Sequence, residues 1–275
     1  MTTMEAPTGI ETIAEAFARA RANGRRAALM PYLMGGYPDL ETSRAIGVAY
    51  AQGGADLVEL GVPFSDPLAD GPVIHAAGTA ALRAGATLPA VLEVAREIAA
   101  HVPVVLMCYA NPILSQGLER FLEALVTARV SGLIVPDLPL EEATEVRPAC
   151  RRRGLAFVPL VAPTTPAERL ERIGAGASGF LYTVSLTGTT GERSEVAGGL
   201  ATVISRTAAH TSVPVAVGFG ISTPEQAVAA AQAGADGVII GSRLVRAAGE
   251  ASDPAAAVGE LVADFSAALS QSPLG

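Results

Sequence analysis

The sequence predicts an α/β protein built as a single (β/α)8 TIM barrel. Short apolar segments alternate with helical patterns along the 275 residues, and eight of these segments have the length of a strand. Their near-continuous apolar character is typical of parallel strands covered on both faces. A short repeat recurs at the even-numbered strands. No shift in composition marks a linker, so we expect one domain over residues 1–275 rather than two doubly wound domains, with 1–8 and 270–275 frayed.

The expected helices and strands follow one another closely. A helix over residues 10–22 precedes the first strand and is additional to the eight repeats. Residues 88–100 keep a helical apolar period, and Arg151 to Arg153 form the charged last turn of another helix. Capping boxes are expected at Thr165-Pro166-Ala167-Glu168 and at Ser222-Thr223-Pro224-Glu225. The expected strands are residues 28–34, 57–60, 104–108, 133–135, 156–160, 180–184, 215–217 and 238–240.

The composition argues against nucleic-acid, membrane and metal functions. With 27 acidic and 19 basic residues, the net charge of −8 provides no basic face. The histidines, His75, His101 and His210, lack metal-ligand spacing. Cys108 and Cys150 lie in an apolar strand and a helix, which fits a reducing compartment. No secretory pattern opens the sequence and no apolar run reaches the roughly 18 residues of a membrane span, so we expect a cytoplasmic protein.

The segment LVELGVPFSDPLADGP, residues 57–72, carries two acids that predict a catalytic site. Glu59 lies in an apolar strand, where an unpaired carboxylate costs several kcal/mol, and Asp70 follows in a turn-rich loop. The repeat aligns Glu59 with Ile134, Leu181 and Ile239, which would pack as a layer inside the barrel. Glu59 interrupts that layer, which favours a functional site over the alternative of a solvated strand face.

Glycine-rich segments after the last three strands predict a phosphate site. Gly220 follows the seventh strand, Gly241 and Ser242 follow the eighth, and a Gly/Thr-rich stretch with Gly191 follows the sixth. Glycines let backbone N–H groups approach an anion, and a short helix starting at Ser242 would direct its dipole toward it. Arg243 either supplies a cation or points outward. The long loop over residues 185–198 is expected to act as a lid.

Together these residues resemble the alpha subunit family of tryptophan synthase. The segment at 57–72 is the most specific match, and YLMGGYP at 32–38, GFGIS at 218–222 and GS at 241–242 also match. The resemblance covers essentially the whole chain. It implies a lyase of tryptophan biosynthesis that cleaves indole-3-glycerol phosphate to indole and glyceraldehyde 3-phosphate. It further implies an α2β2 complex in which indole passes to a β subunit that carries pyridoxal phosphate.

The resemblance also assigns roles by position. Glu59 and Asp70 match the catalytic carboxylates, while Tyr32 and Tyr182 match aromatic residues at the indole site. The phosphate contacts are matched by Gly191, Gly220, Gly241 and Ser242.

Further candidates come from the strand ends and from the loop that carries Asp70. Leu60 and Phe219 lie near strand ends and are candidates for the apolar indole slot, whereas Leu133 is better explained by core packing. Asp66 and Pro67 are candidates for contact with the partner subunit. Two positions depart from the family: Met34 stands where Thr is common, and Leu186 where a polar or basic residue is common.

The cleavage requires acid–base groups and no metal or organic cofactor in this chain. Protonation of indole C3 makes the ring an electron sink, and the glyceryl hydroxyl then loses its proton as the bond breaks. A carboxyl in an apolar interior has a raised pKa and can serve both steps near neutral pH, which suits Glu59. Asp70, in a polar loop, is expected to stay ionised and accept the indole N–H.

Three alternatives share parts of this pattern. A stand-alone lyase that releases indole would have the same residues. A non-catalytic subunit that binds the phosphoester could lose Glu59 or Asp70 without consequence. Another phosphate-binding barrel, an isomerase or an indole-ring-forming synthase, is also possible, but the synthase should carry a lysine at a strand end and the predicted strands contain none.

Overall fold

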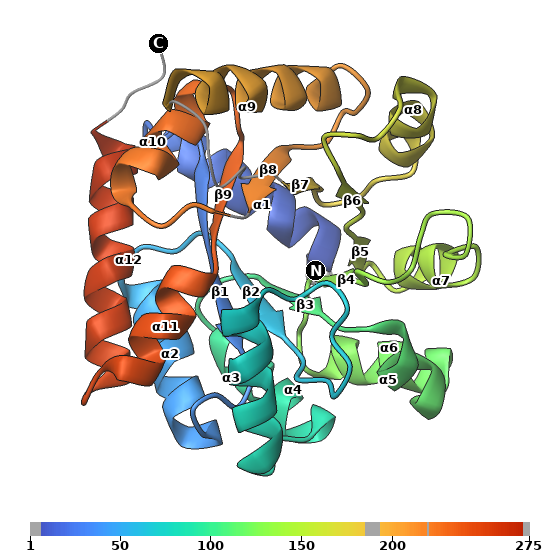
Figure 1. Ribbon diagram of the computed structural model, residues 1–275. Coiled ribbons are helices and arrows are strands. Elements are labelled where there is room, and N and C mark those ends of the chain that lie inside the picture. The colour runs from blue at the N-terminus through green and yellow to red at the C-terminus, as the bar shows by residue number, and fades with distance from the viewer. Residues whose placement is uncertain (1–6, 185–192, 219, 272–275) are drawn as a thin grey trace, which may run out of the picture.

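A closed ring of parallel strands surrounded by helices forms the protein (Figure 1). The structure is a computed structural model that describes residues 7–184, 193–218 and 220–271. The strands form one sheet in the order β5-β4-β3-β2-β1-β9-β8-β7-β6. Their bounds are β1 (Ala28–Met34), β2 (Val58–Gly61), β3 (Val104–Met107), β4 (Gly132–Ile134), β5 (Ala156–Phe157), β6 (Leu160–Val161), β7 (Leu181–Val184), β8 (Val215–Gly218) and β9 (Gly237–Ile240).

The expected fifth strand is divided at Pro159, which has no N–H to donate. The Val158 N–H donates to the Leu133 carbonyl of β4 at 2.9 Å, and the Pro159 carbonyl accepts from the Tyr182 N–H of β7 at 3.1 Å. The two ends of the sheet order are therefore consecutive pieces of one segment. This segment closes the barrel, and the predicted number of eight strand positions is confirmed.

Helices cover the outside of the sheet. Their bounds are α1 (Gly9–Ala22), α2 (Leu40–Gln52), α3 (Pro72–Arg83), α4 (Leu88–Ile98), α5 (Ala110–Gln116), α6 (Leu118–Thr127), α7 (Val146–Arg152), α8 (Ala167–Ala175), α9 (Arg193–Ala208), α10 (Pro224–Gln232), α11 (Ser242–Glu250) and α12 (Pro254–Ser270). Ile13 and Phe17 of α1 pack into the interior cluster of the strands, so this extra helix closes the N-terminal end of the barrel. In the described part of the chain no helix is both long and apolar enough to cross a membrane.

Some helix starts differ from the sequence prediction. Thr165 does not cap α8, because its hydroxyl accepts from the Ala162 N–H at 3.0 Å in the preceding turn. The second capping box is shifted by one residue and joins Thr223 to Gln226. α9 begins at Arg193, inside the loop predicted over 185–198. Residues 185–192, on which the lid prediction also falls, lie outside the described part. Residues 1–8 were expected to fray, but Thr8 is part of the fold as the N-cap of α1.

Side chains alternate between the interior of the barrel and the layer under the helices. Ile134 and Ile239 belong to the interior cluster, as the repeat predicts. The prediction for Leu181 was wrong: it packs outward against α8, and Tyr182 takes the inward position. Gly179, with a φ of +78°, turns the chain just before β7 and shifts the register by one residue.

Candidate active site

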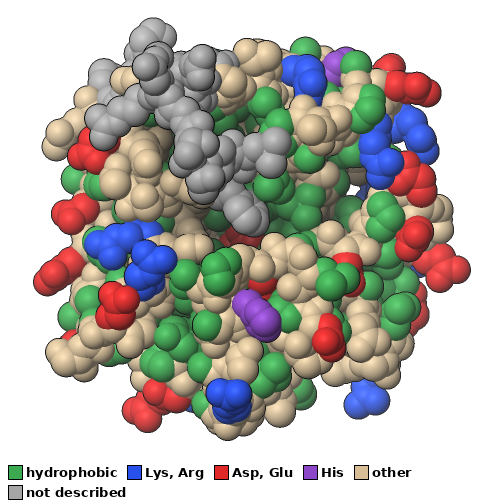
Figure 2. Space-filling view, viewed as in Figure 1, with side chains coloured by type: hydrophobic (Ala, Val, Ile, Leu, Met, Phe, Trp, Pro, Cys, Tyr) green, Lys and Arg blue, Asp and Glu red, His purple; other side chains and the backbone are tan. Residues whose placement is uncertain are grey.

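A cavity of about 720 Å³ opens at the C-terminal ends of the strands. Glu59 and Asp70 both line it, as do residues that follow β4, β6, β8 and β9. The face seen in Figure 2 is hollowed near its middle, with hydrophobic side chains around the hollow. Ligands of (β/α)8 barrels bind at this end of the strands. The cavity therefore lies where the sequence predicts a site.

Glu59 provides a buried carboxyl inside this cavity. It stands on β2, with Tyr32 of β1 and Val105 of β3 as its neighbours across the sheet, and it is 2% exposed. Its Oε2 has no hydrogen-bond partner within the described part of the chain. Burial, followed by the charge of Asp70, raises the pKa of Glu59 from 4.5 to about 8. Such a carboxyl holds a proton near neutral pH and can donate it.

Asp70 occupies a different environment at the end of the loop after β2. It lies just before α3 and is half-buried, and its Oδ1 accepts a hydrogen bond from the Tyr109 hydroxyl at 3.0 Å. Burial raises the pKa of Asp70, while the bond from Tyr109 and the charge of His75 act in the opposite direction. The sequence predicted only a polar loop here. The carboxylate is more enclosed than that, and Tyr109 and His75 favour its ionised form.

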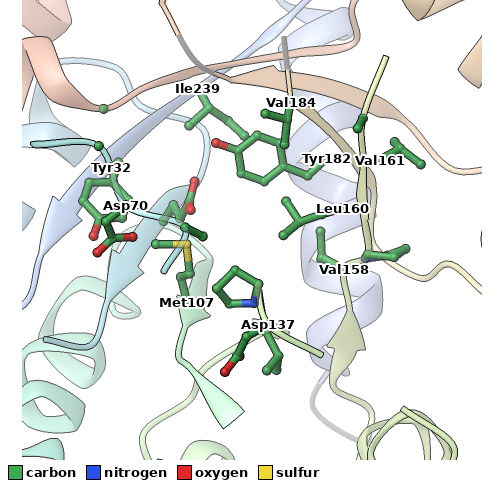
Figure 3. Close-up of a pocket in the computed structure, with 18 of the residues that line it drawn as sticks. Tyr32, Asp70, Met107, Asp137, Val158, Leu160, Val161, Tyr182, Val184 and Ile239 are labelled. Carbon is green, nitrogen blue, oxygen red and sulfur yellow. The ribbon is translucent and has the colours of Figure 1, made fainter. Parts of the chain in front are cut away.

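Tyr32 and Tyr182 stand on opposite sides of the cavity (Figure 3). Each places its hydroxyl against a glycine of the neighbouring strand. A Cβ added to Gly61 would lie 2.1 Å from the Tyr32 hydroxyl oxygen, and one added to Gly218 would lie 2.2 Å from that of Tyr182. Both tyrosine rings therefore need a glycine on the neighbouring strand. The space between the two rings is suited to a flat aromatic ring.

The far end of the cavity presents groups that suit an anion. Gly220, with a φ of +78°, follows β8, and Gly241, Ser242 and Arg243 form the start of α11. The N–H groups of Leu244 and Val245 donate to the Gly241 carbonyl, whereas no such bond to another described residue is recorded for those of Ser242 and Arg243. The helix dipole places positive charge at this end. Arg243 also lines the cavity, and no ion pair with another described residue is recorded for it.

Comparisons with known proteins agree with this geometry. The family model for the tryptophan synthase alpha chain matches residues 17–271. The tryptophan synthase alpha chain of Prochlorococcus marinus (strain MIT 9313) is 50% identical over 237 residues, which cover 86% of this chain and 86% of that protein. The one from Methanosarcina mazei is 46% identical over 241 residues, covering 88% of each. The chain belongs to the tryptophan synthase alpha chain family.

Solved structures of this family have the same fold. The tryptophan synthase alpha subunit of Legionella pneumophila superposes with a TM-score of 0.87 at 36% identity, covering 97% of this chain and 100% of that one. A chain from the structure of the Pyrococcus furiosus tryptophan synthase α2β2 complex gives 0.82 at 37% identity, covering 88% and 98%. The predicted TIM barrel is confirmed, and membership makes the chain a lyase of tryptophan biosynthesis. The isomerase and ring-forming alternatives are thereby set aside.

Not every predicted site residue lies in the cavity. Leu60 was a wrong prediction: it is fully buried in the layer under the helices, because it follows Glu59 directly and must face the opposite side of the strand. Leu133 packs in the same layer, as expected. Gly191 and Phe219 lie outside the described residues, as does Leu186.

Other residues at or beside the cavity were not found from the sequence. Tyr109 and Asp137 follow the third and fourth strands, in the positions where ligand-binding loops begin, and this placement is the signal that could have revealed them. Leu160 and Met107 extend the apolar wall (Figure 3). Within the described ranges, no group of three or more His, Cys, Asp or Glu residues is arranged to hold a metal ion.

Proposed function

We propose that this chain cleaves indole-3-glycerol phosphate with Glu59 as general acid and base and Asp70 as the acceptor of the indole N–H. The observation that carries the proposal is the unequal environment of the two carboxyls in one cavity. Glu59 is almost completely buried and has a pKa raised to about 8, whereas Asp70 is half-buried and accepts a hydrogen bond. Environments that separate two carboxyl pKa values divide the acid and base roles.

The proposed steps require one mobile proton at Glu59. Its neutral carboxyl gives a proton to indole C3, and positive charge develops on the ring nitrogen, where Asp70 balances it. The carboxylate of Glu59 then takes the proton of the glyceryl hydroxyl. The C–C bond breaks as the glyceryl oxygen forms the aldehyde carbonyl, and the electron pair of the broken C–C bond returns to the indole ring. Glu59 ends protonated, as it began.

The other parts of the cavity hold the substrate. Tyr32 and Tyr182 line the proposed indole slot, to which we also assign Phe219. The phosphate is placed on the backbone at the start of α11 and on the loop after β8, with Gly191 as a further contact. The phosphate-binding residues at these two places are Gly220, Gly241 and Ser242.

A pyridoxal-phosphate-containing β subunit is the proposed partner, in an α2β2 complex. The relative from Pyrococcus furiosus belongs to a tryptophan synthase α2β2 complex. The loop that carries Asp70 also carries exposed Asp66 and the half-exposed Pro67, and Leu68 beside them is 89% exposed. Leu68 and Pro67 give this loop two adjacent apolar side chains that a partner could cover. The buried, unpaired thiols of Cys108 and Cys150 support a cytoplasmic location.

Indole release from indole-3-glycerol phosphate tests the roles of the two acids. We expect Glu59→Gln to lower the rate by about 10²–10⁴-fold, and Asp70→Asn to lower it strongly with the fold intact. Near wild-type cleavage by either variant would contradict the assignment. Adding the β subunit separates the alternatives: activation and loss of free indole identify the complex, whereas unchanged indole release identifies a stand-alone lyase.

A further inference from the structure

Tyr109 joins the loop after β2 to the start of α5 through three contacts. Its hydroxyl donates to Asp70 Oδ1 at 3.0 Å and accepts from the Ala69 N–H at 3.0 Å. Its ring stacks on Phe64, with centroids 5.3 Å apart and an interplanar angle of 27°. Phe64, Ala69 and Asp70 all belong to the loop after β2. One side chain therefore fixes this loop near its start and at its end.

The position of Tyr109 is itself fixed. It is the residue before α5 and is 3% exposed. The next residue, Ala110, donates its N–H to Asp137 Oδ1 at 2.9 Å, which ties this turn to the loop after β4. Burial raises the pKa of Tyr109, so the phenol keeps its proton and remains a hydrogen-bond donor at working pH. Tyr109 is not among the residues that line the cavity, so its contact with the site is the hydrogen bond to Asp70.

Several other groups influence the charge of Asp70. Glu59 on β2 and Tyr32 on β1 interact with it electrostatically inside the cavity, and His75 does so from the first turn of α3. Asp137 acts on Tyr109 rather than on Asp70. Of the described residues, Tyr109 provides the one recorded hydrogen bond to the Asp70 carboxylate.

We propose that Tyr109 is the positioning residue of the site: it aims the Asp70 carboxylate at the indole N–H and keeps that carboxylate ionised. The inference rests on the proposed role of Asp70. A hydroxyl that donates to a carboxylate favours the charged form, and the second bond, from the Ala69 N–H, restricts the direction in which the hydroxyl can point. The stack on Phe64 holds the ring, so the donor is oriented before substrate arrives.

The test is the pH profile of kcat/KM in Tyr109→Phe, a variant that retains the ring and its stacking. Removing the donor raises the pKa of Asp70, so we expect the acid limb of the profile to move up by about one pH unit. Below that limb the variant loses about tenfold in kcat/KM. Well above it a smaller loss remains, because Asp70 is ionised but is no longer aimed by the Tyr109 hydroxyl. Binding of 3-(indol-3-yl)propyl phosphate, which lacks the glyceryl hydroxyls and is not cleaved, should weaken over the same pH range.

Two controls separate positioning from general damage. Tyr50→Phe also removes a buried tyrosine hydroxyl, one that donates to the Tyr32 carbonyl at 3.2 Å, and its acid limb should stay in place. Phe64→Leu removes the stack but keeps the donor, and should move the limb less than Tyr109→Phe does. An unmoved limb in Tyr109→Phe, with Asp70→Asn inactive, overturns the role of Tyr109 alone. Full activity of Asp70→Asn would instead overturn the proposed function.

Discussion

The carboxyl of Glu59 leads to a prediction about stability that requires no substrate. Folding raises its pKa from 4.5 to about 8. The fold therefore favours the protonated form, so this stabilising contribution is complete below pH 4.5 and is lost as the pH rises toward 8. Glutamine has nearly the same shape and remains neutral. Glu59→Gln should therefore be more stable than the wild type at neutral pH while losing activity.

The size of the effect follows from the two pKa values. At about 1.36 kcal/mol per unit, the interval from 4.5 to about 8 corresponds to about 5 kcal/mol above pH 8 and about 3 kcal/mol at pH 7. Urea denaturation of both proteins at several pH values between about 5 and 8 gives the free energy of unfolding of each. We expect the difference to be below about 1 kcal/mol at pH 5 and to grow with pH.

A matched control removes a carboxylate that the fold does not bury. Glu15 on α1 is exposed, and no ion pair is recorded for it within the described ranges. Glu15→Gln should leave the pH dependence of the free energy of unfolding parallel to that of the wild type. A difference between wild type and Glu59→Gln that stays constant from pH 5 to 8 would refute the reasoning, because Glu59 would then titrate alike in both states.

Three further predictions concern binding and assembly. Arg243→Gln should raise KM for the phosphorylated substrate by about tenfold with kcat little changed, whereas Arg246→Gln, exposed on the same helix, should leave KM unchanged in steady-state assays. Gly61→Ala should lower kcat/KM because its Cβ would lie 2.1 Å from the Tyr32 hydroxyl oxygen, and adding Tyr32→Phe should restore part of the loss. Asp66→Ala should weaken activation by the β subunit more than basal cleavage; equal losses in rates measured with and without that subunit would count against a partner contact.

The repeated strand pattern was sufficient to locate the buried acid. Glu59 interrupts positions held elsewhere by Ile134 and Ile239, and that interruption correctly indicated a carboxyl inside the barrel. The same alternation should have excluded Leu60, since neighbouring residues of a strand face opposite sides. Leu181 could not be placed in this way, because the extra turn at Gly179 changes the register without changing the apolar pattern.

Contacts between distant loops were beyond reach of the sequence pattern. Tyr109 and Asp70 are 39 residues apart and meet only because β2 and β3 are adjacent in the sheet. Competition between local hydrogen bonds was also hidden: Thr165 has the right spacing to cap α8, yet its hydroxyl is used in the turn before the helix. Sequence patterns identify the helices, the strands and the strand ends where ligands bind. Side-chain contacts between neighbouring strands and loops depend on the three-dimensional structure.

The division of the fifth strand at Pro159 separates the chain into two arcs of the barrel. The first arc, β1 to β5, contributes both acids, and the second, β6 to β9, leads into the turns to which we assign the phosphate. The arcs are joined by the ladder between β1 and β9 on one side and by covalent continuity on the other. A molecule whose ring lies between Tyr32 of the first arc and Tyr182 of the second is thus a non-covalent crosslink. Its binding should slow hydrogen exchange in both arcs.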